Sequence, residues 1–108
     1  MARKLPDPFG YATATSITTA ADGSVAVRYH YTDVATRHPD GTVTLRTGGW
    51  RTVTTKRRIN QALRYFGIPA RLYQHRHDWY VSAYGDGAIE FTDAMRIRVN
   101  GGGLEAAA

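Results

Sequence analysis

Three consecutive cations, Lys56, Arg57 and Arg58, stand where the sequence predicts the first turn of a helix over residues 55–66. A helix N-terminus already presents unpaired N–H groups and a partial positive charge, so each added cation costs about 0.3–1 kcal/mol at an exposed position. A bound phosphate would reverse the sign of that interaction, because helix N-termini and basic side chains both favour anions. The chemistry that this stretch suggests is anion binding.

The residues around this helix start leave two interpretations open. In one, Thr54 and Thr55 cap the helix and also contact a phosphate through their hydroxyls. In the other, they only cap the helix, and the long basic side chains extend into water. Gly48 and Gly49 fit both interpretations, and in the second they only turn the chain tightly so that Trp50 enters the core.

The distribution of charge also favours an anionic partner. The net charge is +5, yet residues 41–77 contain eight basic and no acidic residues, whereas the other 71 residues contain six basic and nine acidic ones. Amide side chains among cations are typical of proteins that contact a nucleic-acid backbone. We predict that the contacts to the anion come from Arg46, Arg51, Thr54, Thr55, Lys56, Arg57, Arg58, Asn60, Gln61, Arg64 and Arg71.

Exposed tyrosines would add base stacking, which is worth about 1–3 kcal/mol per base in proteins that bind single strands. We expect one or two tyrosines to stack on a ligand and the others to pack in the core or across strands. The candidates are Tyr29, Tyr31, Tyr65, Tyr73, Tyr80 and Tyr84.

The stretch HRHD, which contains His75 and His77, suggests metal binding or acid–base chemistry. It falls in a predicted turn, and a zinc site would need further ligands such as His30, His38 or Glu90 to converge on it. A metal-independent nuclease that uses His75 or His77 with an arginine is a second alternative. The sequence has no nucleophile elbow and no phosphate loop. We therefore expect a polar hairpin tip, no metal, no cofactor and no enzyme activity.

Alternating apolar residues separated by turn signals predict about six to seven short strands. Val25, Val27, Tyr29 and Tyr31 fall on one face of a single strand within residues 24–38. After the helix, a hairpin turns near the HRHD stretch. A last pair of strands, residues 88–91 and 95–99, is expected to be joined through residues 92–94.

One helix pattern stands out, because its apolar residues recur at i, i+3, i+4 and i+7 before a Gly and a Pro that end it. These residues are Ile59, Ala62, Leu63 and Phe66. We predict an α+β fold, with a mostly antiparallel sheet of about six to seven short strands and one amphipathic helix, about residues 55–66, packed on one face.

The length of 108 residues predicts one domain, and an apolar fraction of 43% with a charged fraction of 21% is typical of globular proteins. We expect a flexible amino terminus over residues 1–10, the α+β domain over residues 11–100, and a linker with a cloning remnant over residues 101–108. The absence of cysteine excludes disulfide scaffolds and thiolate metal sites. No apolar run reaches bilayer length, so we expect a cytoplasmic protein with no membrane contact.

The run HPDGTVTLRTGGWRTVTTKRRINQAL, followed by RLYQHRHDWYV, resembles a family of small uncharacterised proteins of tailed bacteriophages. The shared core reads L-x-T-GGW-x-T-x-TT-K-x-R-I-N, and the resemblance covers about residues 29–81. It implies a phage accessory protein that acts in the host cytoplasm, and it brings no assigned activity. The positions that carry it are Gly48, Gly49, Trp50, Thr52, Thr54, Thr55, Lys56, Arg58 and Asn60.

These observations lead to two hypotheses from different classes. The first is a phage accessory protein that binds a polyanion, above all nucleic acid, through the basic helix start and the surrounding basic face. The second is a protein-interaction module that binds and modulates a host protein or assembles into a homo-oligomer through its sheet edges.

Overall fold

The computed structural model describes residues 4–83, 86–100 and 103–107. This part of the chain forms one helix, α1 (Val53–Tyr65), and nine strands. The strands are β1 (Thr15–Thr19), β2 (Val25–Tyr29), β3 (Thr32–Arg37), β4 (Val43–Leu45), β5 (Ala70–His75), β6 (Asp78–Ala83), β7 (Asp86–Glu90), β8 (Met95–Asn100) and β9 (Gly103–Ala106).

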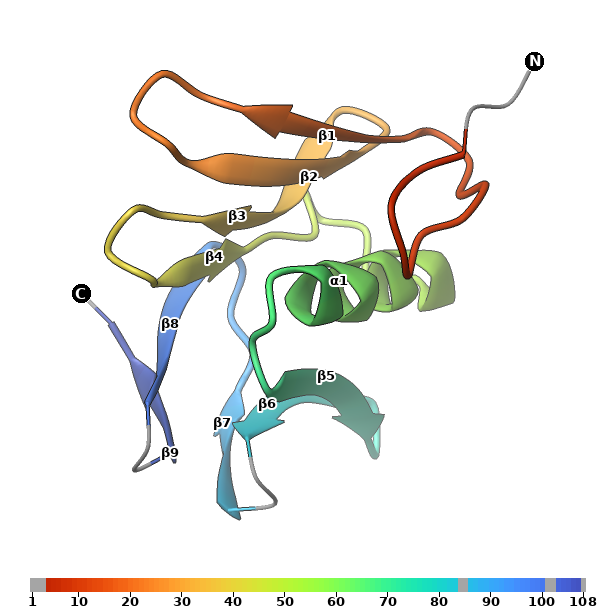
Figure 1. Cartoon of the computed structure of the whole chain (residues 1–108). Coiled ribbons are helices and arrows are strands. Elements are labelled where there is room, and N and C mark those ends of the chain that lie inside the picture. Colours follow the sequence, from red (N-terminus) through yellow and green to blue (C-terminus); the bar gives the residue numbers. More distant parts are fainter. Residues whose placement is uncertain (1–3, 84–85, 101–102, 108) are drawn as a thin grey trace.

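The strands belong to two antiparallel sheets. One has six strands in the order β1-β2-β3-β4-β8-β9, and the other has three in the order β5-β6-β7. Figure 1 shows α1 between them, with β1 to β4 above the helix and β5 to β7 below it. The helix contacts β2 and β3 on one side and β5 on the other. The α+β class and the amphipathic helix are confirmed, although the strands are more numerous than predicted and divide into two sheets.

The apolar stripe of α1 lies in the core that joins the two sheets. Ile59, Ala62 and Leu63 are fully buried, as the helical spacing predicted. Burying a side chain of the size of Ile59 or Leu63 stabilises the fold by about 1.5–3 kcal/mol. The sheets contribute the other large members of the core, which include Val27, Val34, Val43, Leu45, Leu72, Trp79, Val81, Phe91 and Ile97.

Residues 24–38 form a hairpin of two strands instead of the single strand that was predicted. β2 ends at Tyr29, which pairs with Thr32 at the start of β3, so the turn consists of His30 and Tyr31. His30 adopts the left-handed conformation with φ 55°, as tight two-residue turns require. Tyr31 therefore lies at the hairpin tip, where it is 96% exposed, and it does not continue the strand face that it was predicted to share with Tyr29.

The predicted pairing of residues 88–91 with residues 95–99 is also wrong, because β7 pairs with β6 and β8 pairs with β4 and β9. The Phe91 amide donates to the Trp79 carbonyl at 2.8 Å, which keeps the end of β7 beside β6. Two residues later, the Asp93 carboxylate accepts hydrogen bonds from the amide and the hydroxyl of Thr47. The chain thus crosses from one sheet to the other within a few residues.

Both ends of the chain contribute more to the fold than the sequence suggested. Phe9, within the segment predicted to be flexible, is buried in the core and contacts Tyr65 edge-on, with 5.6 Å between ring centroids. Within the predicted linker, residues 103–106 form β9 and pair with β8. In the described part of the chain, no helix is long and apolar enough to cross a membrane.

Candidate functional site

The helix start differs from the prediction in which residue caps it. α1 begins at Val53 and its N-cap is Thr52. The Thr52 hydroxyl accepts a hydrogen bond from the Thr55 amide at 3.1 Å and lies 3.0 Å from the Thr55 hydroxyl. Thr54 and Thr55 are therefore not the capping residues, and Thr55 is buried beneath the cap. A hydroxyl three residues before another threonine is the signal that could have identified Thr52.

Arg58 is a buried cation and not part of an open basic surface. The residue is 7% exposed, and its guanidinium lies 5.5 Å from the centre of the Tyr29 ring. Its Nε donates to the Thr15 hydroxyl and its Nη1 donates to the Gln61 side-chain oxygen, both at 3.0 Å. Burial lowers the pKa of this guanidinium, although an arginine stays cationic at any ordinary pH. Arg58 therefore holds β1, β2 and α1 together.

Two further predicted cations pack on aromatic rings beside the helix start. The Arg51 guanidinium lies 5.1 Å from the centre of the Phe91 ring and 5.6 Å from that of Trp79. The Lys56 ammonium lies 5.5 Å from the Trp79 ring and donates to the Gln74 side chain at 3.3 Å. A cation over a ring is attracted to it by about 0.5–2 kcal/mol. This attraction is a structural reason for basic residues in the first turn that the sequence did not reveal.

The two side-chain amides of the helix that were predicted to contact an anion, those of Asn60 and Gln61, bind the protein's own main chain. Asn60 donates to the Leu72 carbonyl and accepts from the Leu72 amide, each at 2.8 Å. These two bonds give hydrogen-bond partners to the Leu72 amide and carbonyl, on the edge of β5 that faces the helix. Gln61 accepts from Arg58 and donates to the Pro8 carbonyl at 3.3 Å.

Three predicted arginines remain exposed and come together in one hollow between α1 and β5. Within the described residues, Arg57, Arg64 and Arg71 have no ion pair and no side-chain hydrogen bond. The hollow has a volume of about 470 Å³ and no acidic residue in its lining. We call it the arginine groove, and its lining residues are Arg57, Asn60, Gln61, Arg64, Ala70 and Arg71.

Arg46 lies apart from the arginine groove. It follows β4 and lines a different hollow of about 370 Å³, together with Arg28, Tyr31 and Thr32. Arg28 is paired there with Asp33 at 2.9 Å. The structure therefore divides the predicted basic face into at least two separate regions.

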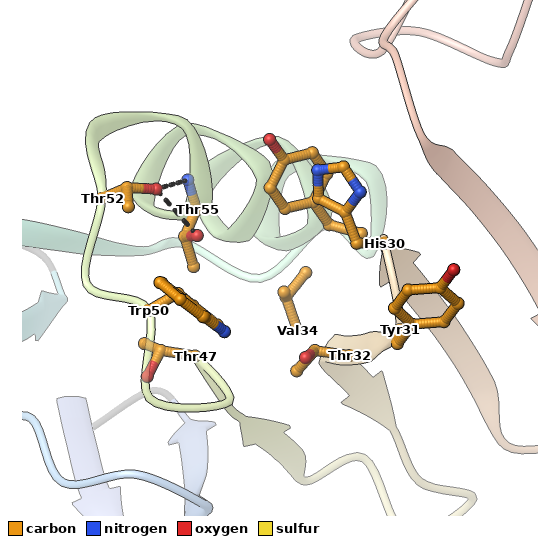
Figure 2. Close-up of a pocket in the computed structure, with 9 residues that line it drawn as sticks. His30, Tyr31, Thr32, Val34, Thr47, Trp50, Thr52 and Thr55 are labelled. Carbon is orange, nitrogen blue, oxygen red and sulfur yellow. Dashed lines mark hydrogen bonds between the residues drawn. The ribbon is translucent and has the colours of Figure 1, made fainter.

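A third hollow, which the sequence did not predict, lies beside the helix cap. It has a volume of about 400 Å³, and we call it the aromatic pocket. Figure 2 shows Trp50 on one side of it, His30 and Tyr31 on the other, and Val34 between them. Four rings line it, those of Tyr29, His30, Tyr31 and Trp50. The other lining residues are Thr32, Val34, Thr47, Thr52 and Thr55.

Trp50 does not enter the core, contrary to expectation, and is 71% exposed. The buried tryptophan is Trp79, which is 3% exposed. Gly48 and Gly49 have φ of 65° and 88°, and the Trp50 amide donates to the Thr47 carbonyl across this tight turn. The two glycines therefore place the indole beside the pocket.

The tyrosines and histidines outside this pocket show no further site among the described residues. Tyr73 and Tyr80 stack on each other across β5 and β6, as expected for cross-strand pairs, with centroids 5.8 Å apart. Tyr84 lies outside the described residues. His75 and His77 are exposed at the turn between β5 and β6. No group of three or more potential metal ligands occurs in the described part of the chain.

Comparison with known proteins identifies a family. The family model of the Kyanoviridae Gp96 protein matches residues 7–98, which covers most of the chain. No curated protein and no solved structure matches it. The resemblance to phage proteins is therefore confirmed at the level of the family, and the GGW-to-RIN core stays a prediction. The chain belongs to the Kyanoviridae Gp96 protein family.

Proposed function

We propose that this phage-family protein binds nucleic acid through the arginine groove. The observation that carries the proposal is the convergence of Arg57, Arg64 and Arg71 in one hollow with no partner among the described residues and no acidic residue in the lining. Three cations held together repel one another, and a bound anion removes that repulsion. A guanidinium presents planar donors that match the geometry of a phosphate.

The spacing of the arginines favours a polymer over a single phosphate. Arg57 and Arg64 lie seven residues apart on α1, which corresponds to about 10 Å along the helix axis. Long side chains that leave the helix at that separation can contact different phosphates. Arg71 on β5 faces them across the groove, so a strand lying in it is contacted from both sides. None of these contacts reads a base, and the groove gives no sequence specificity.

The matched test removes equal charge from two places. R64Q/R71Q removes two cations from the groove, whereas R76Q/R98Q removes two cations elsewhere. Arg76 is exposed, and the half-buried Arg98 is already paired with Asp40 at 3.8 Å and with Glu105 at 3.9 Å. Affinity for labelled oligonucleotides is measured over a range of salt concentrations. We expect the groove variant to lose at least about 10-fold in affinity and to lower the slope of log K against log salt by roughly 1–2, since each phosphate contact contributes about 0.7–0.9.

The control variant should keep the wild-type slope. Equal losses in the two variants would show that only net charge matters, and no binding by the wild-type protein at low salt would overturn the proposal.

A second candidate function is strand addition at β1, either by a host protein or by another copy of this chain. β1 is an edge of the six-stranded sheet and pairs only with β2 in the described part of the chain. An edge strand presents unpaired N–H and C=O groups to a partner. Light scattering across protein concentrations tests self-association. A proline at the exposed Thr19 should abolish it, because the Ala20 amide donates to Ser24 and the Thr19 amide therefore faces away from β2. A protein that stays monomeric excludes the homo-oligomer.

A further inference from the structure

The aromatic pocket exposes more ring surface than packing of the fold requires. Trp50 and Tyr31 are among the most exposed large residues of the described chain, at 71% and 96%, and both line this pocket. The volume of about 400 Å³ falls within the range of small-molecule sites, roughly 300–1,000 Å³. No Asp, Glu, Lys or Arg lines it. The ring surface therefore suits an uncharged, flat ligand.

The hydroxyls near the helix cap are already engaged, and they make the wall rigid. Thr52 and Thr55 bind each other in the cap. The Thr47 hydroxyl donates to Asp93 and accepts from the Gly49 amide. These hydrogen bonds fix the turn that carries Trp50.

Other polar groups in the lining are available to a ligand. The Trp50 indole N–H, the Thr32 hydroxyl and the His30 imidazole have no hydrogen-bond partner among the described residues. In Figure 2 the indole nitrogen of Trp50 points toward the side of the pocket where Thr32 lies. The ligand that matches this set has flat apolar faces and a hydrogen-bonding edge.

A cationic hollow adjoins the pocket and shares two of its residues. Tyr31 and Thr32 line both the pocket and the hollow that contains Arg28 and Arg46. Arg28 is neutralised by Asp33, so Arg46 supplies the net positive charge. A ligand with a neutral ring and one anionic group would place the ring among the aromatics and the anion near Arg46.

We propose that the aromatic pocket binds a nucleobase, with the phosphate of the same nucleotide directed toward Arg46. A nucleobase combines two apolar faces with a polar edge, and its phosphate is the anionic group that the adjoining hollow attracts. Stacking of bases on exposed aromatic side chains is a general mode of single-strand recognition. This inference rests on the proposed function in taking a nucleic acid as the ligand, but it uses different residues, so the two proposals can fail separately.

The first experiment measures ligand binding to the pocket independently of binding to the groove. Adenosine monophosphate is titrated against the protein while the Trp50 indole N–H signal is followed by NMR, with Trp79, which is buried, as an internal reference. Ribose 5-phosphate, which has the phosphate but no base, is the matched ligand. We expect the Trp50 signal to move with the nucleotide and not with the sugar phosphate, and the Trp79 signal to move less.

Variants assign any response to the pocket. We expect W50A to lower nucleotide affinity at least about 10-fold, since the base can no longer stack on the indole. Y31A tests the opposite wall of the pocket. Because Tyr31 lies at an exposed hairpin tip, this variant should fold even if W50A folds poorly. Y11A removes another exposed tyrosine, which lies outside the pocket, and should bind as the wild type does.

The second experiment separates this inference from the proposed function by comparing an oligonucleotide with an abasic strand of the same length. Weaker binding of the abasic strand, with the difference abolished by W50A, supports the base pocket. Equal binding of both strands, together with a silent Trp50 signal, overturns the base pocket and leaves the groove standing. A Trp50 response to the nucleotide without oligonucleotide binding supports the pocket and overturns the groove. No response to either ligand overturns both.

Discussion

The arginine groove and the aromatic pocket are two hollows joined by one buried side chain. Arg58 donates to Gln61, which lines the groove, and its guanidinium covers the ring of Tyr29, which lines the pocket. The groove has three cations without a partner among the described residues, and no aromatic ring in its lining. The pocket has four aromatic rings and no aspartate, glutamate, lysine or arginine. Neighbouring positions of one short helix thus support two surfaces of opposite chemistry.

In both hollows, some side chains make hydrogen bonds that hold the structure, and others stay available to a ligand. In the groove the amides of Asn60 and Gln61 bind the main chain, and the arginines are left free. In the pocket the hydroxyls of Thr52 and Thr55 bind each other in the helix cap, and the rings of Trp50 and Tyr31 are left exposed. The committed groups fix the shape of each hollow. The free groups determine which ligand each hollow favours.

The largest effect is expected from Arg58→Ala, because this residue supports both hollows. The change removes two hydrogen bonds from a charged donor and the cation over Tyr29. We expect a loss of about 2–3 kcal/mol in the free energy of unfolding, which corresponds to a fall of roughly 10 °C or more in Tm. Thermal unfolding followed by circular dichroism measures it.

The neighbouring Arg57→Ala is the matched control for that change. Arg57 is exposed and unpaired among the described residues, so its loss should alter stability by less than about 0.5 kcal/mol. It should nevertheless weaken oligonucleotide binding. Similar melting curves for the two variants would contradict the division between a structural and a free arginine.

Asn60→Ala should disturb the groove and spare the pocket. It leaves the amide and the carbonyl of Leu72 without their side-chain partner on the helix side of β5. An unsatisfied backbone group costs about 1–3 kcal/mol, and entry of water reduces that cost. We expect a loss of about 1–2 kcal/mol in the free energy of unfolding and faster hydrogen exchange at the Leu72 amide. An unchanged exchange rate, or a shifted Trp50 indole signal, would contradict this assignment.

Gly48→Ala should disturb the pocket and spare the groove. A Cβ on Gly48 would collide with the Thr32 hydroxyl, whereas a Cβ on Gly49 would meet no atom within 4 Å. Both glycines have a positive φ, which costs an alanine about 1–2 kcal/mol. G48A should therefore be the less stable of the two variants. In a Thr32→Ala background, G48A and G49A should lose the same free energy of unfolding. If G48A still loses more in that double-mutant cycle, the collision with Thr32 is not the cause.

The sequence predicted the features that depend on local spacing. The i, i+3, i+4, i+7 pattern identified the helix and its buried face, because a helix must bury a stripe of that period. The charge distribution singled out the segment that contains Arg57, Arg64 and Arg71, and their contact with an anion stays a prediction. Which of its cations are free depends on contacts with residues far along the chain, such as the bond from Arg58 to Thr15.

The aromatic pocket was missed because it depends on two turns that are distant in sequence. The two-residue turn at His30 and Tyr31 interrupts a run of alternating residues that reads as one continuous strand. The Gly-Gly turn before Trp50 is compatible with an indole that points either inward or outward. The core contains Trp79, whereas Trp50 is exposed. Periodicity alone does not distinguish the two tryptophans.

The smallest expected effect is a pH dependence that belongs to the pocket alone. Asp93 holds Thr47 in the pocket wall. Burial by itself would raise the pKa of Asp93, but the hydrogen bonds from Thr47 and the charge of Arg51 outweigh burial and lower the pKa below 3.8. A carboxylate with a lowered pKa stabilises the fold at pH values above its unfolded pKa, and that stabilisation is lost as pH falls through the folded pKa.

The pocket should therefore loosen below about pH 4, the usual range of an aspartate pKa. The groove has no carboxylate in its lining and should keep its shape over the same interval. Trp50 and Leu72 amide signals, followed together during an acid titration, report on the two hollows. In Asp93→Asn the side-chain oxygen can still accept from the Thr47 amide and the side-chain NH2 can donate to the Thr47 hydroxyl oxygen. The acid-dependent shift of Trp50 should therefore vanish while the neutral-pH structure persists. If Trp50 titrates equally in this variant, another carboxylate controls the pocket.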